Sequence, residues 1–274
     1  MAFGWLRGGR PHAIDDALWR ETLGLFPFVG HLSIADLERL KRLCESFVAK
    51  KTVTGASGFE VTPAVRTAIA LQACLPALNL GLAGYDDFVE IIVYPDQFLV
   101  PRTRVDEAGV VHEAVEALAG EAMDGGPVVL SWADAMPDHG FGETNVVIHE
   151  FVHKLDLVDG EADGIPPLPR GERQKWHRSL DAAYEAFCDE LDRIEARIPA
   201  DVDPESAAAD AWYAQLPLDP YAATDPAEFF AVSGEAFFTG PARLAAAYPD
   251  WYAALARFFA QDPRVHALPE ATDA

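Results

Sequence analysis

The feature that most constrains this chain is the segment HEFVH at residues 149–153, inside a largely apolar stretch, 144–159, that contains no Gly or Pro. Such a stretch predicts a helix, on which residues four apart lie on one face. His149 and His153 would therefore reach a single Zn²⁺. Glu150 would point to the open side of the metal, where a carboxylate can take a proton from water and pass it to a leaving amine. The alternative is a core helix with two hydrogen-bonded histidines.

The composition limits the class of protein. With 274 residues, 50% of them hydrophobic, the chain can bury a large core. Its net charge of −23 argues against direct binding of nucleic acid or anionic membranes and fits either a solvated surface or a basic protein partner. No secretory signal or membrane span is expected, so we predict a cytoplasmic protein. Cys44, Cys74 and Cys188 are too far apart in sequence to suggest a disulfide framework or a thiolate zinc site.

The periodicity of the chain predicts one α+β domain over residues 1–274, with flexible ends at about 1–12 and 264–274. Short runs of β-branched and aromatic residues predict the strands, and helical periodicity with capping residues predicts the helices. The expected strands are 88–94, 98–101 and 128–132, and the expected helices, besides 144–159, are 34–49, 63–80, 172–198, 204–216, 226–239 and 241–259. Two helices would thus precede the sheet, and a loop would cover 159–171.

A catalytic zinc takes three protein ligands, and the sequence offers three candidates for the third. Asp159 lies ten residues after the first histidine, where metzincins place theirs, but that pattern needs a glycine where this chain has Asp156. Glu228 falls in the first turn of an apolar helix, and its alternative role is a capping box with the N-cap Asp225. Glu235 lies two turns further along the same face, where we favour a partner of a ligating histidine or a core contact over direct ligation.

Several motifs in the same order resemble the Mlc titration factor A family of zinc peptidases, the M90 type. They are QACLP at 72–76, IVYP at 92–95, HEFVHKLD at 149–156 and YAATDPAEFFAV at 221–232. The similarity covers residues from about 20 to 260. It implies a zincin-like fold with a small mixed sheet and a mainly helical C-terminal half.

The resemblance also implies a gluzincin-like site. His149, His153 and Glu228 would be the ligands of Zn²⁺, and Glu150 would be the general base. Tyr221 matches the catalytic tyrosine of the family, whose phenol would donate a hydrogen bond to the oxyanion. On the sequence alone, an aromatic residue that anchors the turn before the helix is the competing interpretation of Tyr221.

We therefore expect a zinc-dependent metallopeptidase that acts on peptide substrates. Aminopeptidase-like activity follows only from the resemblance, as does regulation of the glucose phosphotransferase system through an Mlc-like repressor. The alternative is a non-catalytic, zinc-containing regulator that sequesters such a repressor. A purely structural zinc site is disfavoured because such sites use four protein ligands, mostly Cys and His. Of the isolated histidines, His139 is the one to examine for substrate contact.

Overall fold

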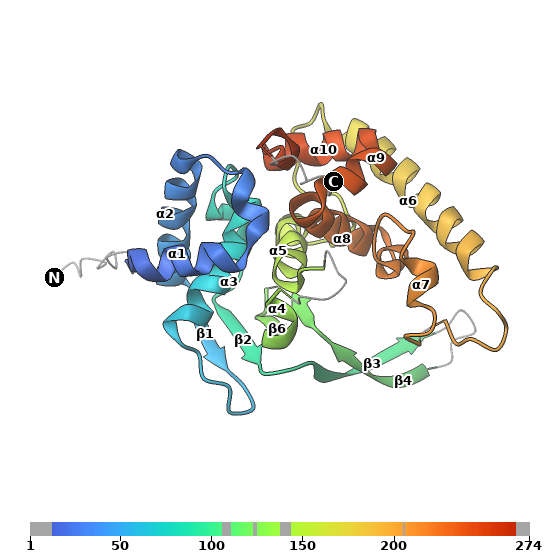
Figure 1. The fold of residues 1–274 in the computed structure, drawn as a ribbon, viewed down its shortest axis with the longest axis horizontal. Helices are drawn as coiled ribbons and strands as arrows, with labels where there is room; N and C mark the ends of the chain where they lie inside the picture. Colours follow the sequence, from blue (N-terminus) through green and yellow to red (C-terminus); the bar gives the residue numbers. More distant parts are fainter. Residues whose placement is uncertain (1–12, 106–110, 123–124, 138–143, 205, 267–274) are drawn as a thin grey trace, which may run out of the picture.

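The structure is a computed structural model, and it describes residues 13–105, 111–122, 125–137, 144–204 and 206–266 (Figure 1). Its α-helices are α1 (Asp16–Leu25), α2 (Ile34–Lys50), α3 (Pro63–Ala77), α4 (Trp132–Ala135), α5 (Val146–Asp156), α6 (Arg173–Glu195), α7 (Asp210–Tyr213), α8 (Pro226–Thr239), α9 (Pro241–Ala247) and α10 (Pro249–Phe259). Its strands are β1 (Thr52–Gly55), β2 (Glu90–Tyr94), β3 (Phe98–Val105), β4 (Val111–Leu118), β5 (Gly120–Ala122) and β6 (Val128–Ser131). Short 3₁₀ turns are η1 (Pro27–His31), η2 (Leu82–Tyr85), η3 (Leu157–Asp159), η4 (Pro220–Ala223) and η5 (Pro263–His266).

Four short strands form a mixed sheet in the order β1-β2-β6-β5. β1, β2 and β6 run parallel, with Ile91 opposite both Val53 and Val128. β5 joins β6 in the antiparallel direction and forms one edge of the sheet. All four residues of β6 are buried, as expected for a central strand covered on both faces. This mixed α/β architecture agrees with the coarse prediction of a small mixed sheet and many helices.

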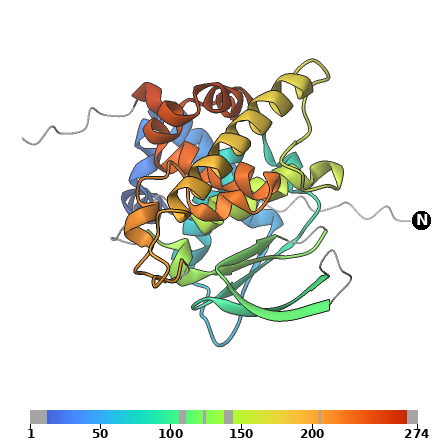
Figure 2. The same ribbon diagram turned by 90° about the vertical axis from the view of Figure 1, so that its right-hand side faces the viewer.

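β3 and β4 form a separate antiparallel ribbon, whose register runs from Phe98 opposite Leu118 to Val105 opposite Val111. The predicted strand 98–101 is therefore too short, and it lies outside the main sheet. In Figure 1 the ribbon extends below α7, and Figure 2 shows the strands beneath the helices of the C-terminal half.

The helices α3 and α8 form the centre of the core on either side of α5. In α3 every residue from Thr67 to Ala77 is buried, and the helix ends one residue after Pro76. In α8 every residue from Phe229 to Phe238 is buried. Gly234 allows α8 to approach α5 closely, because a Cβ added there would lie 2.7 Å from Val152 Cγ2. Close approach of another helix, rather than local distortion, thus explains a glycine in the middle of this helix.

Several predicted boundaries are wrong. α1 and the four-residue β1 were not predicted, so three helices precede β2. The predicted helix 241–259 is two helices, because a residue before proline avoids the helical region and Tyr248, at φ −130° and ψ 69°, precedes Pro249. The predicted helix 204–216 is reduced to α7, since Ala209 is the only buried residue among those described between 204 and 215, and packing adds little to helical propensity there. Within the described residues, no helix is long and apolar enough to cross a membrane.

Candidate metal centre

Helix α5 carries His149 and His153 on successive turns, and Glu150 directly follows His149. The side chain of Asn145 caps the helix by accepting a hydrogen bond from the backbone N–H of Ile148 at 2.8 Å. The apolar residues of the helix, among them Val147, Phe151 and Val152, are buried. This packing leaves the two imidazoles partly exposed, with 12% of each side chain accessible.

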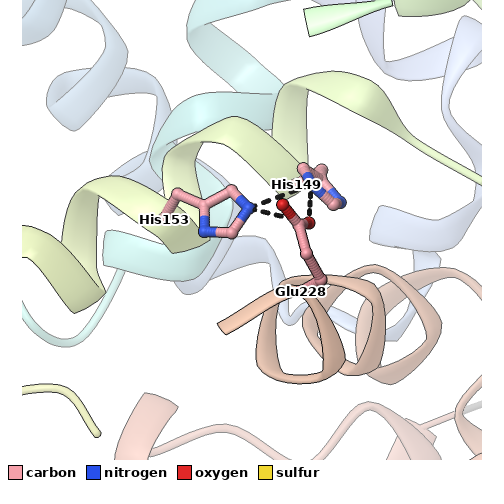
Figure 3. A group of neighbouring side chains, drawn as sticks. All are labelled: His149, His153 and Glu228. Carbon is pink, nitrogen blue, oxygen red and sulfur yellow. Dashed lines mark hydrogen bonds and ion pairs between the residues drawn. The ribbon is translucent and has the colours of Figure 1, made fainter. Parts of the chain in front are cut away.

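Glu228 comes from the first turn of α8. Asp225 caps that helix, and its Oδ1 accepts hydrogen bonds from the N–H groups of Ala227 and Glu228, each at 2.9 Å. The Glu228 carboxylate turns toward α5, where Oε2 lies 3.1 Å from Nε2 of both His149 and His153 (Figure 3). The structure therefore shows the Glu228 carboxylate in contact with the two histidines, and not in the capping box that was its alternative role.

The three side chains offer a compact set of donor atoms. One ligand atom from each of His149, His153 and Glu228 lies within 4.8 Å of the others, and the two Nε2 atoms are 3.1 Å apart. Two imidazole nitrogens and one carboxylate oxygen match the three-ligand set of catalytic zinc sites, which keep one position for water. The donor chemistry therefore fits a divalent metal ion such as zinc.

A second carboxylate orients the first histidine. Glu235 Oε1 lies 2.7 Å from His149 Nδ1, on the side of the ring away from Glu228, and Glu235 Oε2 accepts the backbone N–H of Asn145 at 2.5 Å. The Asn145 side chain in turn donates to Gln72 Oε1 at 2.7 Å. A carboxylate partner of this kind fixes the ring of a metal-binding histidine and raises its basicity. Of the two roles weighed for Glu235, the structure shows the partner of a histidine.

The charges of the site are strongly coupled. Burial raises the pKa of Glu150 to about 7, and the nearby histidines only partly oppose that rise. Burial alone would lower the pKa of His149, but hydrogen bonds to Glu228 and Glu235 outweigh it and raise that pKa well above its usual value. Burial would raise the pKa of Glu228, yet its hydrogen bonds to His149 and His153 lower it well below the usual range. Glu150 thus has a pKa suited to exchanging protons near neutral pH.

Tyr221 lies in η4, seven residues before Glu228. The hydroxyl of Tyr221 donates to Glu228 Oε1 at 3.2 Å, and its ring centroid is 6.1 Å from that of His149. Tyr221 is 49% exposed, so this residue is accessible to solvent beside the site. Burial of its hydroxyl and the charge of Glu228 raise the pKa of Tyr221, which keeps the phenol a neutral hydrogen-bond donor.

The edge strand β5 lies directly against the Glu150 carboxylate. A Cβ added to Gly120 would be 2.3 Å from Glu150 Oε1 and 2.7 Å from Val146 Cγ2, so only a glycine fits there without displacing a neighbour. β5 pairs with β6 on one side, and its other side has no strand partner in the part of the chain that the structure describes. An extended chain could therefore add to this edge beside Glu150.

The remaining candidates are not all brought to the site. Asp159 is exposed at the end of η3 and does not belong to the group of ligand atoms. His139 lies outside the described residues. Sequence reasoning missed Gly120 and the link from Gln72 to Asn145. Two features of the sequence could have predicted this link. Gln72 places an amide side chain inside the apolar helix α3, where it needs a hydrogen-bond partner, and Asn145 is an N-cap residue immediately before α5.

Comparisons with known proteins identify the family of this chain. The family described as glucose-regulated metallo-peptidase M90 matches residues 5–260. The chain belongs to this family. The Mlc titration factor A of Klebsiella pneumoniae (strain 342) is 36% identical over 246 residues, which cover 89% of this chain and 86% of that protein. That of Serratia proteamaculans (strain 568) is 36% identical over 255 residues, 93% of this chain and 90% of that protein. The resemblance inferred from the four motifs is confirmed.

Proposed function

We propose that this M90 protein is a zinc-dependent metallopeptidase with a zincin-like fold. The observation that carries the proposal is the convergence of His149, His153 and Glu228 beside a buried carboxylate, Glu150. We assign the first three as ligands of Zn²⁺. A bound zinc ion would supply Lewis-acid chemistry, which acidifies water and polarises a carbonyl group.

Three further residues would take part in the reaction: Glu150 would transfer protons, Tyr221 would stabilise negative charge, and Glu235 would orient a ligand. Glu150 accepts a proton from the attacking water and later gives it to the leaving amine, and a pKa of about 7 suits both steps. Tyr221 donates a hydrogen bond to the oxyanion while remaining neutral. Glu235 holds the ring of His149, so that Nε2 rather than Nδ1 faces the metal position.

The peptide substrate would lie along β5. Its extended backbone would pair with the edge of β5 that faces away from β6, where no other strand pairs within the described residues, and this would bring a carbonyl near Glu150. Aminopeptidase-like specificity, cytoplasmic action and the single-domain organisation are further parts of this proposal.

The test is hydrolysis of chromogenic peptides by the zinc-loaded protein, with zinc content measured in parallel. Glu150→Gln is the matched control, because it keeps the shape of the side chain and the three ligands. We expect cleavage by the wild type, and its loss in a Glu150→Gln protein that still holds zinc. Peptides with free and acetylated N-termini distinguish an aminopeptidase from an endopeptidase. Equal activity of both proteins would contradict the role of Glu150.

The name of the relatives favours a second candidate function. Because they are called Mlc titration factor A, we propose that this chain also binds an Mlc-like transcriptional repressor and so regulates the glucose phosphotransferase system. The net charge of −23 would favour a basic partner surface. If binding is independent of catalysis, Glu150→Gln should bind the purified repressor as tightly as the wild type. Absence of binding by both proteins would contradict this candidate.

A further inference from the structure

Asp156 has a buried carboxyl group that does not belong to the group of metal-ligand atoms. It ends α5, one turn after His153, and none of its surface is exposed. Its Oδ2 accepts the backbone N–H of Gly164 at 2.8 Å, and its Oδ1 has no hydrogen-bond partner among the described residues. Burying a carboxyl group with so few partners is costly, so its one strong contact needs an explanation.

Gly164 is held on three sides. Its N–H binds Asp156 of α5, and its carbonyl accepts the indole N–H of Trp176 of α6 at 2.8 Å. Its φ of +78° lies in the left-handed region, and a Cβ added there would be 2.5 Å from the carbonyl oxygen of Pro226. The backbone of the loop therefore fits between the end of α5 and the first residue of α8.

This contact lies next to the third metal ligand. Pro226 is only two residues before Glu228, and Glu228 must reach both histidines of α5 from α8. The spacing between the two helices at this end is thus set by the loop backbone at Gly164, which Asp156 holds in place. At the other end of α5, Glu235 of α8 accepts the N–H of Asn145.

We propose that Asp156 and Gly164 are positioning residues for the metal centre. They fix the start of α8 at the distance from α5 at which Glu228 completes the ligand set. The inference rests on the proposed function, because it presupposes that the three residues bind zinc. It gives a role to the residue that occupies the place of the metzincin glycine.

Two glycines of the same loop provide a matched test. Gly160 also has a positive φ, +95°, but a Cβ added there would meet nothing within 4 Å. Gly160→Ala therefore introduces the same kind of backbone strain as Gly164→Ala without the collision with Pro226. Zinc affinity of the full-length proteins would be measured by chelator competition, and unfolding would be measured without metal.

We expect Gly164→Ala to weaken zinc binding about 10- to 100-fold, the range found when residues that support metal ligands are changed, and Gly160→Ala to change it by less than about threefold. Asp156→Ala should resemble Gly164→Ala. Asp156→Asn should keep affinity closer to that of the wild type, since it retains an oxygen that can accept the N–H of Gly164. The visible absorption of the Co²⁺-substituted proteins should report altered ligand geometry in the weakened variants alone.

Equal zinc affinity of folded Gly164→Ala and Gly160→Ala would overturn the inference, as would a loss of stability with no change in zinc affinity or Co²⁺ spectrum. If Gly164→Ala does not fold, the comparison of Asp156→Ala with the isosteric Asp156→Asn decides in the same way. A wild-type chain that binds no zinc contradicts the proposed function itself. A wild type that binds zinc, with variants that bind equally, contradicts only the positioning role.

Discussion

Raising the pH from 5.5 to 8 should destabilise the metal-free protein, because Glu150 and Asp156 are carboxyl groups that folding keeps protonated. Burial raises the pKa of each to about 7 from ordinary values of 4.5 and 3.8. The folded state then binds more protons than the unfolded state between the two values, so stability falls as pH rises through this window. His149 acts with the same sign, because its folded pKa is also raised and the stability that this provides is lost as pH rises.

The size of the effect follows from these shifts. One pKa unit corresponds to about 1.4 kcal/mol, and integration from pH 5.5 to 8 gives a loss of about 2 kcal/mol for Glu150 and about 2 kcal/mol for Asp156. Glu228 has the opposite sign, since its pKa is lowered. Its stabilisation is lost only as pH falls below its ordinary value of 4.5, outside the window. The metal-free protein should therefore lose about 4 kcal/mol or more.

Urea unfolding with excess chelator, followed by the fluorescence of the six tryptophans, measures this loss. Glu150→Gln and Asp156→Asn remove one titrating group each, so each should reduce the loss by about 2 kcal/mol. Their comparison with the wild type also removes the general effect of pH on the acidic surface. A wild-type stability that is constant or rises between pH 5.5 and 8, or variants with the same pH dependence as the wild type, would refute the reasoning.

Three substitutions test separate contacts. Tyr221→Phe should lower the kcat of the zinc-saturated protein about 100- to 1,000-fold through loss of one oxyanion donor; a normal kcat would exclude that role. Gly120→Ala should lower peptidase activity while zinc stays bound, because the new methyl group displaces the Glu150 carboxylate; unchanged activity would contradict the close contact between Gly120 and Glu150. Gly234→Ala should cost about 1–3 kcal/mol of unfolding free energy, since its Cβ meets Val152, and a stabilised variant in urea would contradict the close approach.

Local signals in the sequence were enough to predict the two helices that carry the site. The apolar run with two histidines became α5, and the N-cap Asp225 with Pro226 marked the start of α8. These predictions succeeded because capping and periodicity act over a few residues. The split at Pro249 was equally local, and the rule for the residue before a proline was available to predict it.

The strands were harder to predict, because pairing depends on distant partners. β5 has only three residues, Gly120–Ala122, and its sequence has no β-branched residue; it becomes a strand because β6 is beside it. β1 is likewise held by β2 rather than by its own four residues. The part of the site that depends on β5, the contact of Gly120 with Glu150, could therefore not be inferred from local pattern.

The roles of the two glutamates on α8 show where sequence reasoning stops. Seven residues turn a helix by close to two full turns, so Glu228 and Glu235 must share a face, and both must meet whatever packs there. The sequence cannot say that His149 lies between them, with Nε2 at 3.1 Å from one and Nδ1 at 2.7 Å from the other. That arrangement requires α5 and α8 to lie at one spacing, which Gly234 permits in the middle of α8 and the backbone of Gly164 limits at its start. Which glutamate serves as the proposed ligand and which supports His149 is thus decided by how α5 and α8 pack together.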